Sequence, residues 1–243
     1  MHILEWHDFL AEKPQICALT VGVFDGVHRG HQLLLESVIR RGQLPTVLTF
    51  NTNPKKIFRS FSGDIYSVKR KLEIFETMGI QRTVLIDFSQ TFRAMDGISF
   101  MHVLMDKGMQ YLAIGNDFRC GYQQNIDAQT IQTVCEPCGC SVEIIQPLLS
   151  KGEIIHSSRI RNAILRSDFI EAEQLLGRPF ILDLELFKEE KDGSFTLKKS
   201  GFLIPPDGAY MLPVYYGTQL KYAQLTIKEN KIWIHSLNTN NCV

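Results

Sequence analysis

The stretch from Ile16 to Leu35 constrains the fold more than any other part of the sequence. It opens with an apolar, partly β-branched run from Ile16 to Val23, which is typical of a strand covered on both faces. Gly22, Gly26 and Gly30 let the backbone turn tightly and approach a ligand closely. Apolar residues then recur at helical spacing. The stretch therefore predicts a buried strand, a tight turn and a helix.

The start of this helix is a candidate phosphate site. A helix N-terminus offers unpaired N–H groups and a partial positive charge. His28 and His31 fall in its first turn, and each can donate a hydrogen bond to a phosphate oxygen. Asp25 either orients the loop or caps the helix, with capping the expected role. Phe24 either lines a ligand pocket or belongs to the core.

The rest of the first 180 residues repeats the alternation of strand and helix. Further strands are expected at 46–50, 82–88, 111–115 and 141–145, and helices at 6–12, 67–78, 99–105, 128–135, 158–165 and 168–176. Such alternation predicts a doubly wound parallel sheet of the α/β class. Because its ligands bind beyond the carboxyl ends of the strands, the Gly/His turn should converge with loops 51–54 and 116–121.

The pattern changes after Gly177-Arg178-Pro179. Strands separated by Gly, Asp and Asn turns are expected at 181–187, 195–204, 209–216, 222–227 and 232–237. The sequence thus predicts two domains, an α/β domain at residues 1–180 and a smaller all-β domain at residues 181–243.

Composition narrows the classes of function. A formal net charge of zero gives no basic excess for nucleic acid or an anionic membrane, so small-molecule partners are expected. The sequence shows no secretory signal and no apolar run long enough for a bilayer. Six irregularly spaced cysteines predict reduced thiols and a cytoplasmic protein. The C-x-x-C-x-C cluster at residues 135–140 favours a turn over a metal site, because no fourth ligand motif appears.

The ten residues from Gly22 to His31, G-V-F-D-G-V-H-R-G-H, resemble the motif G-x-F-D-G-V-H-x-G-H of bacterial FAD synthetase, a bifunctional riboflavin kinase/FMN adenylyltransferase of the HxGH nucleotidyltransferase superfamily. Four later segments match in order: TFNTNP at 49–54 is similar to T-F-D-P-H-P, GNDFRCG at 115–121 to G-x-D-F-R-F-G, IHSSRIR at 155–161 to V-S-S-T-x-I-R, and LLGRPF at 175–180 to the link between the family's two modules. The resemblance covers residues 16–180.

The resemblance implies that ATP and FMN react to give FAD and pyrophosphate, with magnesium carried mainly on the ATP phosphates and no metal-ligating residues. It implies catalytic roles for His28, His31 and Arg161. The other residues implied to bind ATP are Gly22, Phe24, Asp25, Gly26, Gly30, Asp117, Ser157 and Ser158, and those implied to bind flavin are Asn51, Asn53, Asp117, Phe118 and Arg119. Taken without the resemblance, Ser157 and Ser158 are helix caps, and Asp117 is equally well a turn former.

Two departures from the family leave alternatives open. Asn51, Thr52 and Asn53 replace the family's Asp, Pro and His, which motivates a different phosphorylated acceptor such as a pantetheine, nicotinamide or polyol. A third hypothesis, after FMN and another acceptor, is a flavin- or nucleotide-binding protein that has lost catalysis. The kinase motif G-R-x-L-G-x-P-T-A-N does not occur, so residues 181–243 are expected to be a truncated, barrel-like remnant of riboflavin kinase without kinase activity.

Overall fold

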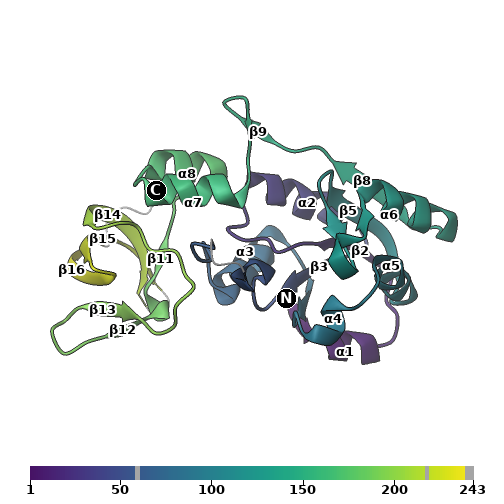
Figure 1. Ribbon diagram of the computed structural model, residues 1–243, viewed down its shortest axis with the longest axis horizontal. Helices are drawn as coiled ribbons and strands as arrows, with labels where there is room; N and C mark the ends of the chain where they lie inside the picture. The colour runs from purple at the N-terminus through teal and green to yellow at the C-terminus, as the bar shows by residue number, and fades with distance from the viewer. Residues whose placement is uncertain (58–60, 217–218, 239–243) are drawn as a thin grey trace. The chain divides into compact units, whose positions relative to one another are not determined.

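The computed structural model describes residues 1–57, 61–216 and 219–238. The chain forms two compact units, which are described separately (Figure 1). The first unit comprises residues 1–57 and 68–149, and the second comprises residues 58–67 and 150–243. This division differs from the expected boundary near Phe180, because the two helices before that residue group with the C-terminal sheet. As functional domains, residues 1–180 and 181–243 stay a prediction.

The first unit is built on a six-stranded sheet in the order β1-β4-β3-β2-β5-β8, in which every neighbouring pair is parallel. The strands are β1 (His2–Glu5), β2 (Cys17–Val21), β3 (Leu44–Phe50), β4 (Arg82–Ile86), β5 (Met109–Gly115) and β8 (Ser141–Ile145). The helices are α1 (Trp6–Ala11), α2 (Arg29–Ile39), α3 (Val68–Met78), α4 (Gln90–Arg93), α5 (Gly97–Asp106) and α6 (Ala128–Cys135). The predicted α/β class and its parallel sheet are confirmed.

Two sets of helices bury the sheet. One core cluster joins the strands to buried side chains of α1, α5 and α6, including Phe9, Phe100 and Ile131. The buried residues Leu35 of α2 and Phe75 of α3 lie outside that cluster. This separation is the one expected when helices cover both faces of a doubly wound sheet. Because β2 is covered in this way, all five of its residues are buried.

The order of the strands places a switch point between β2 and β5. From β2 the chain moves to β3 and then β4 on one side, and it returns to β5 on the other side of β2. The loops that leave the carboxyl ends of neighbouring strands diverge at such a point, and the crevice between them is where sheets of this class bind ligands. The order β3-β2-β5 also confirms that loops 22–31, 51–54 and 116–121 start at one edge of the sheet.

Two short strand pairs and several 3-10 turns complete the connections. The pairs are β6 (Arg119–Cys120) with β7 (Ile126–Asp127), and β9 (Leu149–Ser150) with β10 (Glu153–Ile154). The 3-10 turns are Pro54–Ile57, Tyr122–Gln124, Glu136–Cys138 and Leu184–Leu186.

The second unit combines helices α7 (Ser157–Leu165) and α8 (Phe169–Leu176) with a curled sheet in the order β11-β14-β15-β16-β13-β12. Its strands are β11 (Leu182–Asp183), β12 (Phe187–Glu189), β13 (Phe195–Leu197), β14 (Gly208–Tyr216), β15 (Gln219–Lys228) and β16 (Lys231–Asn238). Among the described strand pairs of this sheet, β11 and β14 run parallel and the others run antiparallel. A second, mostly antiparallel β unit is therefore confirmed.

Three details of the sequence prediction are wrong. The expected strand 181–187 is interrupted by the turn at Leu184–Leu186, since the Asp183 carboxylate accepts a hydrogen bond from the Glu185 N–H at 3.1 Å. The expected strand 195–204 ends at Leu197. The edge strand β1 was not predicted, because only Leu4 of its four residues is buried and no alternation is long enough to see.

Candidate functional site

The turn between β2 and α2 is held in an unusual backbone conformation. Gly26 has φ of 78°, which glycine adopts freely. Phe24 and Val27 also have positive φ, 52° and 40°, and both side chains are fully buried. A bulky or β-branched residue in this region is strained and persists only where the surrounding structure enforces it. The turn is therefore fixed by packing at the switch point of the sheet.

His28 caps α2. Its Nδ1 accepts a hydrogen bond from the His31 N–H at 3.3 Å, so Asp25 is not the N-cap and that expectation is wrong. Because Nδ1 is an acceptor, the neutral imidazole carries its proton on Nε2. The His28 and His31 rings are stacked with centroids 3.6 Å apart. The structure thus brings the two predicted catalytic histidines together at the N-terminus of an eleven-residue helix.

Phe24 connects the histidines to the core. Its buried ring packs edge-on against His31, with centroids 5.2 Å apart, and against Phe75 of α3 at 5.5 Å. The core reading of Phe24 is therefore confirmed, and its contact with ATP stays a prediction. A Cβ at Gly22 would lie 3.1 Å from the Phe24 ring, so a larger residue there would require the ring to shift by a few tenths of an ångström.

Lys71 is a polar residue of this region that the sequence analysis missed. Its side chain is buried, and its ammonium donates to the carbonyl oxygens of Val23 and Phe50 and to Thr49 Oγ1. The helical spacing did place residue 71 four residues before Phe75, on the buried face of α3. A lysine on an apolar helix face was the signal available in the sequence.

The residues expected to bind flavin lie on the two neighbouring loops. Asn51 follows β3, and its Oδ1 is buried without a hydrogen-bond partner among the described residues. Asn53 is buried, and its Oδ1 accepts from the Lys55 N–H at 3.0 Å, so this amide shapes the turn. Asp117 and Arg119 are exposed after β5. Phe118, between them, packs against the core of the sheet.

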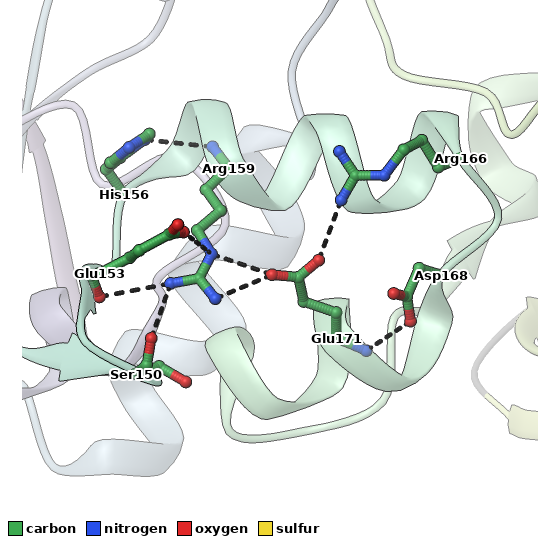
Figure 2. A network of polar contacts seen from close by, with 7 residues as sticks. All are labelled: Ser150, Glu153, His156, Arg159, Arg166, Asp168 and Glu171. Atoms are coloured by element: carbon green, nitrogen blue, oxygen red, sulfur yellow. Dashed lines mark hydrogen bonds and ion pairs between the residues drawn. The ribbon is translucent and has the colours of Figure 1, made fainter.

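Ser157, Ser158 and Arg161 lie in α7, which belongs to the second unit. The N-cap of α7 is His156, whose Nδ1 accepts from the Arg159 N–H at 3.1 Å, so the expectation that the serines cap this helix is wrong (Figure 2). Ser158 is exposed. Arg161 is buried, and its Nε donates to the Gly63 carbonyl at 2.8 Å.

A network around Arg159 fixes the start of α7 (Figure 2). The guanidinium makes two close contacts with the Glu171 carboxylate of α8, at 2.9 and 2.8 Å. It also donates to the carbonyl oxygens of Ser150 and Glu153 in the hairpin that precedes the helix, at 3.0 and 3.3 Å. Glu171 is shared with Arg166 at 3.0 Å. The sequence analysis missed this network, because nothing in the local pattern pairs residue 159 with residue 171.

The cysteine cluster is part of the core. Cys135 and Cys140 are buried and Cys138 is exposed. The hydrogen bond that the Cys140 thiol donates to Cys135 is the largest cause that raises the pKa of Cys140, and burial adds to it. Within the described residues, no three side chains of His, Cys, Asp or Glu come together in a way that could hold a metal ion. None of the described helices combines the length and apolar character needed to cross a bilayer.

The doubly wound sheet and the H-x-G-H turn at its switch point are the features that define the HxGH nucleotidyltransferase class. A family model described as FAD synthetase matches residues 10–159. The chain belongs to the FAD synthetase family. This result confirms the resemblance drawn from the motifs.

The curated relatives extend beyond the matched region. A bifunctional riboflavin kinase/FMN adenylyltransferase from Pseudomonas fluorescens is 33% identical over 171 residues, which cover 68% of this chain and 55% of that protein. The protein of the same name from Escherichia coli K12 is 31% identical over 182 residues, covering 71% of this chain and 58% of its own length. The chain thus spans somewhat more than half the length of these relatives.

A solved structure supports the fold across both units. The structure titled macrolide-efflux protein from Streptococcus pneumoniae has a TM-score of 0.78 and 22% sequence identity, and the match covers 99% of this chain and 94% of that one. At this identity the likeness concerns the fold alone.

Proposed function

We propose that the chain is an FMN adenylyltransferase, which transfers the adenylyl group of ATP to FMN and forms FAD and pyrophosphate. The observation that carries the proposal is the pair of stacked histidines at the N-terminus of α2, held by a strained turn at the switch point of the sheet. Membership of the FAD synthetase family supports this choice of reaction.

In the proposed reaction, a phosphate oxygen of FMN attacks the α-phosphorus of ATP in line. The new P–O bond forms as the bond to the pyrophosphate oxygen breaks, and the electron pair leaves on pyrophosphate. The attacking phosphate is largely ionised at neutral pH, so no general base is required. Catalysis then rests on positioning and on stabilising the charge that builds up on the α-phosphate oxygens.

His28 and His31 are suited to stabilising the charge on the α-phosphate oxygens. With Nδ1 of His28 accepting a hydrogen bond in the cap, Nε2–H is the ring group with the chemistry to donate to an anionic oxygen. The N–H groups and the partial positive charge at the start of α2 act in the same direction. We assign Arg161, Ser157 and Ser158 to the β- and γ-phosphates, as the family motif implies, because a guanidinium can bind two phosphate oxygens at once.

We assign binding of the acceptor, FMN, to the loops that follow β3 and β5. The buried Asn51 Oδ1 without a partner supports a contact with a donor group of the acceptor, such as a hydroxyl or ring N–H of FMN. We assign Asn53, Asp117, Phe118 and Arg119 to the same side. Magnesium would be carried mainly on the ATP phosphates, since the proposal gives it no protein-built site.

We further propose that the C-terminal β unit is a barrel-like relative of riboflavin kinase without kinase activity, and that the protein acts on small molecules in the cytoplasm. The absence of the kinase motif from the sequence supports the first part. FMN would then have to be supplied by a separate kinase reaction.

Product analysis by HPLC tests the proposal. The purified chain is incubated with magnesium-ATP and either FMN or riboflavin. We expect FAD from FMN and no flavin product from riboflavin. His31→Gln should lower the rate by about 100- to 1000-fold, the effect of losing one donor to a developing oxyanion. His102→Gln is the matched control, because His102 is exposed on α5 and should leave the rate unchanged.

Each other outcome points to a definite alternative. FMN formed from riboflavin would overturn the assignment of residues 181–243. FAD absent in both reactions, together with tight binding of FMN or ATP, would favour a protein that has lost catalysis. AMP transfer to another phosphorylated compound in a screen would favour a different acceptor. The replacement of the family's Asp, Pro and His at residues 51–53 is the reason to consider this alternative.

A further inference from the structure

Lys71 is a buried cation at the carboxyl ends of β2 and β3. Its Nζ lies 3.1 Å from the Val23 carbonyl oxygen, 2.9 Å from Thr49 Oγ1 and 3.1 Å from the Phe50 carbonyl oxygen. Thr49 Oγ1 in turn donates to the Val23 carbonyl at 3.2 Å. The ammonium carries three N–H donors, and all three of these acceptors lie within hydrogen-bond distance of it. Lys71 therefore ties the end of β3 to the first residues of the turn after β2.

The tie acts on the strained part of the turn. Val23 directly precedes Phe24, whose φ is 52°, and the Val23 carbonyl belongs to the peptide that sets this angle. One helical turn after Lys71, Phe75 packs edge-on against the Phe24 ring. α3 thus holds Phe24 from both sides, through its preceding carbonyl and through its ring. The Phe24 ring also contacts the His31 ring, which stacks on His28.

A lysine is a costly way to hold a turn if stability is all that is needed. Burying an ammonium carries a desolvation cost that well-packed apolar residues avoid. In return it holds two loops at once and puts a full positive charge at the edge of the sheet where the phosphates are proposed to bind. Positions of strain and buried charge of this kind cluster at functional sites.

We infer that Lys71 is a positioning residue for adenylyl transfer, which sets the geometry of the Phe24–His31 contact and so of both histidines. The inference rests on the proposed function. Lys71 acts through the Val23 carbonyl and Phe24 and does not itself touch the reacting phosphates. Lys71 lies outside the segments of the sequence that resemble the family motifs.

The test compares Lys71→Met with Ile74→Ala. Methionine keeps the length and apolar stem of the side chain and removes the charge and the donors. Ile74 is buried on the same helix, so its truncation provides a matched loss of stability that leaves the Lys71 ammonium in place. Steady-state FAD formation, thermal unfolding and amide hydrogen exchange of residues 22–31 are measured for both variants and for Lys71→Arg.

We expect Lys71→Met to lower kcat by about 100-fold, the size of effect that a displacement of about 1 Å has on a reacting geometry. Ile74→Ala should keep its kcat at a temperature where it is folded, and Lys71→Arg should recover part of the lost rate. Exchange at residues 22–31 should rise in Lys71→Met and not in Ile74→Ala.

Equal kcat and equal exchange in the folded Lys71→Met and Ile74→Ala variants would overturn the inference. If Lys71→Met does not fold, the same comparison is made with Lys71→Arg, which must then show faster exchange in the turn than the wild type. The exchange measurement needs no turnover. A wild-type protein that forms no FAD would therefore overturn the proposed function and leave the positioning role of Lys71 open to this measurement.

Discussion

Replacing Arg159 by methionine is the perturbation whose effect on stability the structure defines best. Methionine keeps most of the apolar stem and the helical preference, and it removes the guanidinium from the network at the start of α7 (Figure 2). The Arg159 side chain is 11% exposed, and its partner Glu171 is 17% exposed. The variant therefore leaves a mostly buried carboxylate that has lost two of its contacts.

The magnitude follows from the partners that remain. Breaking a buried ion pair by removing one member costs about 3–5 kcal/mol. Glu171 keeps its contact with Arg166 at 3.0 Å, which places the cost near the lower end, about 3 kcal/mol. Arg166→Met is the matched control, because its side chain is 62% exposed and the same carboxylate keeps Arg159. Because the Arg166 guanidinium is largely solvated, its pair with Glu171 should contribute about 0–1 kcal/mol, as surface ion pairs do.

Urea unfolding can follow the second unit by itself. The chain has two tryptophans, Trp6 in the first unit and Trp233 in the second, so a Trp6→Phe background makes Trp233 the only reporter. With a slope of about 2 kcal/mol per molar urea, Arg159→Met should lower the midpoint by about 1.5 M and Arg166→Met by less than about 0.5 M. A shift for Arg159→Met that is no larger than that for Arg166→Met would refute the reasoning.

Three further predictions concern the first unit. His28→Asn should keep the cap on α2 and leave the thermal stability nearly unchanged. It should nevertheless slow FAD formation, because about 2–4 kcal/mol of transition-state stabilisation is lost with the ring. An unchanged rate would contradict the role of the ring. The pKa of Glu143 is lowered, chiefly by the Ser37 hydroxyl, so this contribution to stability is present above about pH 4.5 and is lost as the pH falls; the difference in unfolding midpoint between wild type and Glu143→Gln should shrink from pH 7 toward pH 3. Burial raises the pKa of Cys120 to about 12, so thiol labelling at pH 8, followed by peptide mass spectrometry, should modify the exposed Cys138 well before Cys120.

The sequence by itself determined the plan of the first unit. Strands buried on both faces appear as continuous apolar runs, and the run that became β2 was visible as such. Glycine spacing and two histidines marked the turn and the start of α2, since these signals are local. The family motif is also a property of consecutive residues, so the candidate nucleotide site could be placed at the carboxyl edge of the sheet.

Only the tertiary structure decided which groups hold the turn after β2 and the start of α7. His28 and His156 became helix caps in place of Asp25 and the serines, because the cap depends on where each helix begins and on the angle of the entering chain. Lys71 and Arg159 meet acceptors 21 to 48 and 6 to 12 residues away, and no local pattern records such a partner. In the C-terminal sheet the strand ends depend on pairing between distant segments, as in β13 with β16. Local propensity fixed the elements, and long-range polar contacts fixed the geometry of the turn after β2 and of the start of α7.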